Sequence, residues 1–290
     1  MHYFAIVVLA VLVVFLSLFI FVWVQFRKSI YIHSTPDQNL IKKYSISKKE
    51  VFLHSKNNHK ISGWHISISK PKGMVILVHG YSTHKGGKSQ MLGHAEYLKK
   101  AGFATFLVDL RSFGESDGGK VSFGLKEWED LEVVYDYLRG LSEYKSIKIG
   151  YLGISMGAST AINVVGKTGK GDFVIASVPF ADIDSIFVKD VLKRGYPVWL
   201  FQPFVKLATR LEYGKEYKSN FSINLISKVV VPILVIRSKK DDMVGDSDAI
   251  DLFKRANEPK FLWEADTGHD VFNDAPNEFK KRVLDFLTSN

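Results

Sequence analysis

The chain begins with a long apolar stretch that has no polar face. Residues 1–26 contain no Asp, Glu, Lys or Arg, and residues 4–24 are apolar except for Ser17. About 20 helical residues cross a hydrocarbon core of roughly 30 Å, and Trp23 and Phe26 suit the interface at the end of the run. A cleaved signal peptide is disfavoured, because no basic residues precede the run and no small-x-small site follows it. We therefore expect a retained transmembrane anchor at 1–26.

Beyond a polar segment that contains Pro36, which we interpret as a linker over 27–43, the pattern changes to short apolar runs. Two alternating runs at 44–55 and 60–69, separated by Lys56-Asn57-Asn58-His59, predict an antiparallel hairpin. The next runs are uninterrupted, which is typical of parallel strands buried on both faces. These strands are expected at 74–80, 103–110, 147–155, 172–180, 231–238 and 260–266. Helical periodicity lies between or after them, at 89–100, 124–140, 156–167, 246–256 and 276–288.

This alternation predicts an α/β domain over 44–290, with one mostly parallel sheet, an N-terminal antiparallel hairpin and helices on both faces. About fifty residues separate the strand near Pro179 from the strand that starts at Val231, far more than a connecting loop needs. We interpret the segment at about 185–230 as a helical cap over the ends of the strands. Its aromatic residues are expected to form the core of the cap, with lipid contact as the alternative.

The net charge of +9 is concentrated just after the apolar stretch. Residues 27–60 hold eight Lys or Arg against two acids, Asp37 and Glu50. Such a basic collar suits nucleic acid or anionic lipid headgroups, and the neighbouring apolar helix favours lipid. Only His2 and the amino terminus precede the helix, so the positive-inside tendency predicts a single-pass protein with its domain on the cytoplasmic side. We expect a membrane partner and no nucleic acid.

A candidate nucleophile lies where a predicted strand becomes a predicted helix. The sequence Gly153-Ile154-Ser155-Met156-Gly157 matches a Gly-x-Ser-x-Gly turn, which could also be only a tight turn. A strand–turn–helix context favours the catalytic interpretation, because such an elbow exposes the serine hydroxyl at the edge of the sheet. A serine hydroxyl needs a base, a group that orients the base, and an oxyanion hole.

Later segments provide these partners in a suitable order. His269 follows the last predicted strand and is the candidate base, and Asp241, three residues after Ser238, is the candidate acid, with Asp242 in reserve. The chain contains no cysteine, so thiolate catalysis and disulfides are excluded. The backbone N–H groups of Met156 and Tyr81 are the expected oxyanion donors.

Other motifs have weaker functional interpretations. His84 and His94 lack a third ligand at metal spacing, and "GGKS" at 86–89 lacks the first glycine of a phosphate loop, whose place is taken by Ser82. We therefore expect no metal and no cofactor. His79 is expected to pack beneath the oxyanion turn, and Asp109 and Arg111 to hold loops by a buried ion pair.

Taken together, His79-Gly80, "DLRSFGES" at 109–116, Gly-x-Ser-Met-Gly, "SKKDDMV" and Gly268-His269 resemble the α/β-hydrolase superfamily. The resemblance covers roughly 45–290 and is greatest to the monoacylglycerol lipase/lysophospholipase-like and serine-aminopeptidase-like branch. That branch usually has glycine where this chain has Ser112 and Ser238, which affects turn conformation more than catalytic identity.

The resemblance implies a serine hydrolase whose Ser155, His269 and Asp241 form a catalytic triad. With the anchor, the collar and the cap, we expect a membrane-anchored enzyme that cleaves a small-molecule or lipid acyl ester, or a thioester, through an acyl-enzyme. A peptidase or amidase with the same triad is the first alternative, and a non-catalytic binding module on this fold is the second. The sequence leaves the acyl length, the headgroup, the membrane and the oligomeric state open.

Overall fold

The computed structural model describes residues 2–55, 58–215, 217–245 and 247–290. Lys56 and Asn57 of the predicted hairpin turn lie outside the described residues. The same holds for Met1 of the predicted anchor, Glu216 of the predicted cap and Asp246 of the helix predicted at 246–256.

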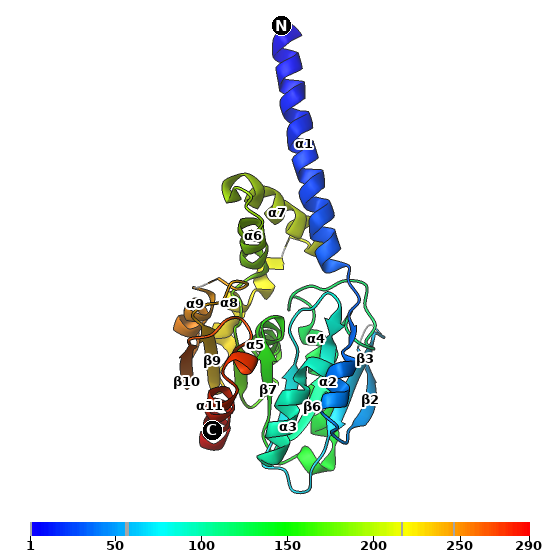
Figure 1. Ribbon diagram of the computed structural model, residues 1–290, viewed down its shortest axis with the longest axis vertical. Helices are drawn as coiled ribbons and strands as arrows, with labels where there is room; N and C mark the ends of the chain where they lie inside the picture. Colours follow the sequence, from blue (N-terminus) through cyan, green and yellow to red (C-terminus); the bar gives the residue numbers. More distant parts are fainter. Residues whose placement is uncertain (1, 56–57, 216, 246) are drawn as a thin grey trace.

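A single eight-stranded sheet forms the centre of the domain (Figure 1). The strand order is β10-β9-β8-β7-β4-β6-β3-β2. β3 runs antiparallel to both β2 and β6, and all other neighbours are parallel. This confirms the predicted mixed sheet with an N-terminal hairpin. The strands are β2 (Lys49–His54), β3 (Lys60–Ile66), β4 (Met74–Val78), β6 (Ala104–Val108), β7 (Ile149–Ile154), β8 (Val174–Ser177), β9 (Ile233–Ser238) and β10 (Lys260–Ala265).

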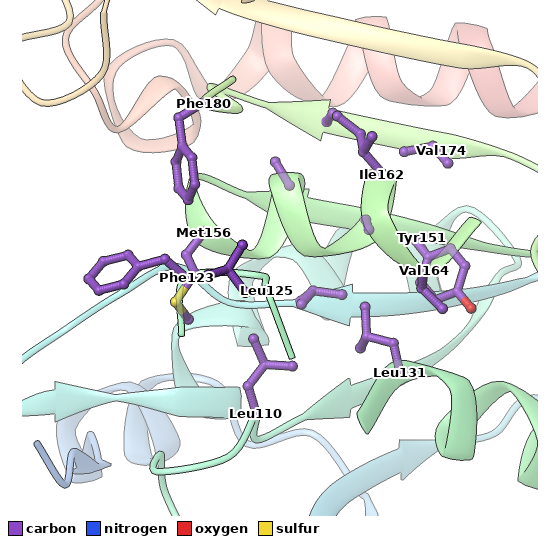
Figure 2. Packing of buried hydrophobic residues seen from close by; sticks show 14 of the residues in the cluster. Leu110, Phe123, Leu125, Leu131, Tyr151, Met156, Ile162, Val164, Val174 and Phe180 are labelled. Atoms are coloured by element: carbon purple, nitrogen blue, oxygen red, sulfur yellow. The ribbon is translucent and has the colours of Figure 1, made fainter. Parts of the chain in front are cut away.

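Helices cover both faces of the sheet because successive strand side chains point to opposite sides. In β4, for example, Ile76 belongs to one apolar cluster and Leu77 to the other. The first cluster includes side chains of α4 (Trp128–Gly140), α5 (Met156–Thr168) and α9 (Asp248–Arg255), and the second those of α3 (Leu92–Lys100) and α11 (Pro276–Ser289). Figure 2 shows Leu131, Ile162 and Val174 of the first cluster. The remaining short helical segments of the body are η1 (Gly87–Met91), η2 (Ser142–Tyr144) and α10 (Val271–Asp274).

The N-terminal helix α1 (His2–Ile30) projects away from the domain (Figure 1). By length and composition it can cross a membrane. Its 29 residues span roughly 44 Å, more than a hydrocarbon core of about 30 Å. It continues four residues past the predicted end of the anchor, and only Val22, Phe26 and Ile30 are buried. The last two turns of α1 therefore belong to the domain.

The segment predicted as a linker contains regular structure. Within 27–43, β1 (Thr35–Pro36) pairs with β5 (Lys85–Gly86). The side chain of Asp37 then caps α2 (Gln38–Lys43) by accepting a hydrogen bond from the Asn39 N–H. The Asp37 N–H itself donates to Ser89 Oγ at 2.8 Å. These partners lie about fifty residues away along the chain, so a local sequence pattern does not indicate them.

The predicted cap consists of α6 (Ile183–Lys193), α7 (Val198–Tyr213), η3 (Tyr217–Asn220), α8 (Ser222–Leu225) and η4 (Ile226–Lys228). α7 lies beside α1 (Figure 1), and the ring of Phe204 is 6.0 Å from that of Phe15. Phe201 is buried, as expected for cap core, whereas Trp199 is 78% exposed. The cap is therefore packed against the apolar helix through α7, and α8 and η4 of the cap contact α5 of the body.

Candidate active site

Ser155 lies on a sharp turn between β7 and α5. Its backbone has φ 53° and ψ −115°, a strained conformation for a residue with a side chain. The Ser155 N–H donates to the carbonyl oxygen of Ser177 at 2.8 Å, which holds the turn against β8. A Cβ at Gly153 would overlap the backbone of Gly157, and a Cβ at Gly157 would overlap the carbonyl oxygens that end β4. Both glycines are therefore required for this elbow to form.

Asp241 and His269 come together from the loops after β9 and β10. His269 Nδ1 is 2.7 Å from Asp241 Oδ2. Asp241 Oδ1 accepts hydrogen bonds from the N–H groups of Met243 and Val244, at 2.8 and 2.9 Å. The side chain of Asp241 is only 5% exposed. Both its oxygens are thus held, and the imidazole orientation follows from the fixed carboxylate.

The charge state of Asp241 suits this arrangement. Burial alone would raise its pKa, but hydrogen bonds from His269 and from the backbone, together with the His269 charge, lower the pKa below the usual value. An ionised carboxylate accepts the Nδ1–H of a neutral imidazole. Nε2 is then free of its proton and can act as a base.

Asp242, the reserve acid of the sequence analysis, lies elsewhere. Its side chain is 67% exposed and pairs with Lys193 of α6 at 2.6 Å. The geometry therefore favours Asp241 as the partner of His269.

The turn after β4 approaches the serine elbow closely. A Cβ placed on Gly80 would lie 3.6 Å from the Cβ of Ser155 and 3.4 Å from the Ile154 carbonyl oxygen. This brings Tyr81, the next residue, beside the elbow. Met156 is the first residue of α5, where a backbone N–H has no partner within its own helix. The roles of these two N–H groups as oxyanion donors remain predictions.

Side-chain contacts fix the oxyanion turn from below and from the side. His79 is fully buried, accepts a hydrogen bond from the Leu110 N–H at Nε2 (3.1 Å) and therefore donates from Nδ1 to the Gly80 carbonyl oxygen (2.7 Å). Burial lowers its pKa, which keeps the ring neutral. The Tyr81 hydroxyl donates to the Ser29 carbonyl oxygen of α1 at 2.7 Å, and burial raises its pKa to about 12. The expected structural role of His79 agrees with these contacts.

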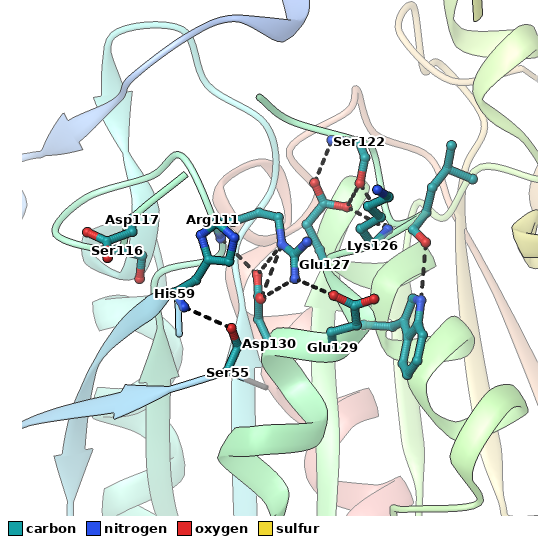
Figure 3. Close-up of polar contacts among 12 residues, drawn as sticks. Ser55, His59, Arg111, Ser116, Asp117, Ser122, Lys126, Glu127, Glu129 and Asp130 are labelled. Carbon is teal, nitrogen blue, oxygen red and sulfur yellow. Dashed lines mark hydrogen bonds and ion pairs between the residues drawn. The ribbon is translucent and has the colours of Figure 1, made fainter. Parts of the chain in front are cut away.

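The expected ion pair between Asp109 and Arg111 is wrong, because each residue has another partner. Asp109 pairs with the buried Lys88 at 2.9 Å. Arg111 pairs with Asp130 of α4 at 2.6 Å, as Figure 3 shows. Lys88 Nζ also lies 2.6 Å from Glu115. The lysine of the "GGKS" segment is therefore held by the carboxylates of Asp109 and Glu115. Lys88 and Asp109 are 21 positions apart in the sequence with α3 between them, so no local pattern indicates this pair.

A second buried acid, Glu127, closes the loop before α4. It accepts hydrogen bonds from the Ser122 N–H and hydroxyl, both at 2.6 Å (Figure 3). It also accepts one from the Gly124 N–H at 2.8 Å. The sequence analysis did not single out Glu127. Its position three residues after a glycine in a polar loop carries no distinctive signal.

The two histidines considered for metal binding, His84 and His94, have different environments. His94 is buried against Phe272, with ring centroids 4.0 Å apart, and burial lowers its pKa to about 3. His84 is exposed in the loop before β5. Within the described ranges, no three His, Asp or Glu side chains gather as a metal site.

The domain has the α/β-hydrolase fold. Its sheet is mostly parallel, a serine lies on the elbow after β7, and a His–Asp pair lies on the loops after β9 and β10. A family model described as serine aminopeptidase, S33, matches residues 69–227, and the chain belongs to that family. The matched range includes Tyr81 and Ser155, whereas Asp241 and His269 lie beyond it.

Relatives and solved structures extend the similarity over most of the chain. YqkD of Bacillus subtilis, which is itself uncharacterised, is 26% identical over 279 residues, covering 89% of each protein. YfhR of Escherichia coli K12, also uncharacterised, is 23% identical over 265 residues, covering 88% of this chain and 85% of YfhR. The esterase Pf2001 of Pyrococcus furiosus superimposes with a TM-score of 0.73 at 26% identity, covering 89% of this chain and 98% of the esterase.

Proposed function

We propose that the protein is a membrane-anchored serine hydrolase that cleaves a carboxylic ester or thioester. The observation that carries the proposal is the 2.7 Å contact between His269 Nδ1 and a buried Asp241, on loops at the same carboxyl edge of the sheet as the strained Ser155 elbow. Similarity to the Pyrococcus furiosus esterase supports an ester as the substrate.

The reaction follows from the arrangement of these groups. Ser155 Oγ attacks the acyl carbonyl while His269 Nε2 takes its proton, and Asp241 stabilises the imidazolium. The N–H groups of Met156 and Tyr81 bind the developing oxyanion. The imidazolium gives its proton to the leaving alcohol or thiol, which leaves the acyl group on Ser155. Water, deprotonated by His269, then releases the acid and restores the serine.

The membrane part of the proposal rests on α1. Nearly all side chains of its first five turns are exposed apolar groups, which are stable only in lipid or detergent. Arg27 and Lys28 follow the apolar run, so we assign the domain to the cytoplasmic side.

The decisive experiment is labelling of the full chain with a fluorophosphonate, comparing the wild type with Ser155→Ala. We expect labelling of the wild type only. In intact cells, a membrane-impermeant probe should label the protein only after lysis. No labelling of a folded wild type would favour the binding-module alternative, and labelling that survives Ser155→Ala would mean that another serine reacts.

A peptidase is the second candidate, favoured by the description of the matching family. Matched p-nitrophenyl ester and p-nitroanilide substrates separate the two activities. A kcat/KM higher for the anilide than for the ester would replace the esterase proposal by the peptidase one.

A further inference from the structure

Beyond its role as an anchor, α1 forms part of a cavity next to the candidate active site. We propose that the last two turns of α1 are one wall of the substrate pocket, and that this pocket takes a single-chain lipid ester with an anionic headgroup, entering from the bilayer. This inference rests on the proposed function and assigns its substrate class.

The main cavity has a volume of about 450 Å³ and lies where four segments meet. They are α1, the turn after β4 that contains His79, Gly80 and Tyr81 (the oxyanion turn), α6, and the loop after β9 that contains Asp241, Asp242 and Met243 (the acid loop). Its walls include Gln25, Lys28 and Ser29 of α1, Tyr81 of the oxyanion turn, Phe187 of α6 and Met243 of the acid loop. Tyr81 carries one of the proposed oxyanion donors, and Met243 holds Asp241 through its N–H. A ligand in this cavity therefore touches α1, the turn that carries Tyr81 and the loop that holds Asp241, whereas Ser155 and His269 do not line the cavity.

A smaller cavity of about 60 Å³ continues from the main one along α1. The two share Gln25, Ser29 and Phe187 in their walls. Farther along, the wall is formed by Phe21 and Phe201 and is mainly apolar. An acyl chain can thus follow an apolar path between α1 and the cap, from the level of Phe21 down to Tyr81.

The position of the cap relative to the apolar helix indicates where this path opens. The Phe204 ring of α7 lies 6.0 Å from Phe15 and 6.5 Å from Phe19, both within the apolar run. If residues 4–24 span a bilayer, the Phe204 side of α7 therefore lies among the acyl chains, because Phe15 is near the middle of the apolar run. The exposed side chains of Trp199 and Leu211 on α7 suit that environment.

The wall of α1 is held rigidly against the catalytic elements. The Phe26 ring lies 4.8 Å from Phe187, and the Ser29 carbonyl oxygen accepts the Tyr81 hydroxyl at 2.7 Å. The Val121 N–H donates to the carbonyl oxygen of Ile30. These contacts join α1 to the cap, to the oxyanion turn and to the loop before α4.

The charge around the main cavity points to an anionic headgroup. Its lining contains four cationic residues against two carboxylates, a net of +2; the cations are Lys28, Lys189, Lys193 and Arg194, and the acids Asp190 and Asp242. Lys193 pairs with Asp242, and Arg194 with Asp190. Lys28 is exposed at the end of α1, where a headgroup would lie while its chain occupies the apolar path.

The chain itself offers a matched pair of variants for the wall. Gln25→Trp fills the cavity, whereas Val24→Trp puts the same side chain on the exposed face of α1, outside both cavity walls. The full chain is reconstituted in nanodiscs, and kcat/KM is measured for palmitoyl-lysophosphatidylglycerol and for p-nitrophenyl acetate. We expect Gln25→Trp to lower the ratio of lipid to acetate by at least about tenfold, and Val24→Trp to leave that ratio at its wild-type value. Equal ratios for the two variants would overturn the inference.

A second pair of variants tests the headgroup. Lys28→Glu changes a residue of the cavity wall, and Arg27→Glu makes the same change of charge on the neighbouring residue outside it. We expect Lys28→Glu to lower the preference for lysophosphatidylglycerol over uncharged monopalmitoylglycerol by about tenfold, and Arg27→Glu to change it much less. Equal changes would contradict a headgroup site at Lys28.

Failure of this inference differs from failure of the proposed function. If the wild type neither reacts with a fluorophosphonate nor cleaves the acetate, the hydrolase proposal is wrong. If it does both in a Ser155-dependent way, but the two tryptophan variants behave alike, only the role of α1 in the pocket is wrong.

Discussion

At the scale of single residues, the two neighbouring aspartates of the acid loop have opposite environments. Asp241 is buried against His269, and Asp242 is paired with Lys193 at the surface. The sequence "KKDD" does not indicate which of the two aspartates orients His269, because their distances from the end of β9 differ by only one position. The choice depends on which carboxylate the loop turns inward, and the N–H groups of Met243 and Val244 turn Asp241 inward.

Replacing each aspartate by asparagine should separate their roles. Asp241→Asn removes the charge that selects the Nδ1–H tautomer, so we expect kcat on p-nitrophenyl acetate to fall by about 10⁴-fold. Asp242→Asn loses an exposed ion pair, and we expect kcat to fall by less than about threefold. A larger loss for Asp242→Asn than for Asp241→Asn would reverse the assignment.

Ser112 has a backbone conformation that is strained for a residue with a side chain. It has φ 69°, and its buried hydroxyl has no hydrogen-bond partner among the residues that the structure describes. Glycine, which the similar family usually has at this turn, removes both costs. We expect Ser112→Gly to raise the free energy of unfolding by about 1 kcal/mol, measured by denaturant titration in detergent. A destabilised variant would mean that the hydroxyl has a favourable contact.

At the scale of elements, the start of α5 and the end of β4 are in close backbone contact, with no room for a side chain between them. The start of α5 passes so close to the end of β4 that a Cβ at Gly157 would overlap the carbonyl oxygens of Val78 and His79. Because these are backbone atoms, neither partner can move without shifting the sheet. This contact therefore fixes the distance between the elbow and the end of β4, in addition to the hydrogen bonds that His79 and Tyr81 make.

Gly157→Ala should damage this crossing. We expect it to lower the free energy of unfolding by about 2 to 3 kcal/mol and to reduce fluorophosphonate labelling of Ser155 in the protein that still folds. Gly119→Ala is the control, since a Cβ at Gly119 would meet no atom of the described residues within 4 Å. If both variants had the same stability as the wild type, the close approach would be of no consequence.

The elements also show which features a sequence can predict. The uninterrupted apolar runs predicted the central strands because burial on both faces requires them, and the Gly-x-Ser-x-Gly turn indicated its own position between β7 and α5. The pairing of β1 with β5 and the partners of Asp109 and Arg111 were not predicted correctly. Those contacts depend on which distant loops meet in three dimensions, and several residue types satisfy the same local pattern.

At the scale of the whole molecule, stability depends on a carboxyl group buried between the cap and the acid loop. Asp248, in the first turn of α9, accepts a hydrogen bond from the Gly245 N–H at 3.0 Å. Burial, with a contribution from the charge of Asp182, raises its pKa to about 6. The folded state therefore holds this proton to a higher pH than the unfolded chain does.

Consequently, the free energy of unfolding falls as the pH rises from about 4, the pKa of Asp248 in the unfolded chain, to its folded pKa. Above the folded pKa, the free-energy penalty for ionising the buried Asp248 remains constant. Asp248→Asn removes that cost. We expect the stability of the variant relative to the wild type to be higher at pH 8 than at pH 4 by on the order of 2 kcal/mol, measured by thermal unfolding in detergent. Asp251→Asn on the same helix is the control, and a pH-independent difference for Asp248→Asn would contradict the burial argument.

The junction at Ser29 and Ile30 also determines how the domain moves. Since α1 continues directly into contacts with the cap and the oxyanion turn, no free tether separates the helix from the domain. If α1 spans a bilayer, the domain therefore cannot rotate freely relative to the membrane. The proposed nucleophile, Ser155, then stays at one fixed height above the lipid, and under the proposed function the protein meets its substrates by lateral diffusion in two dimensions.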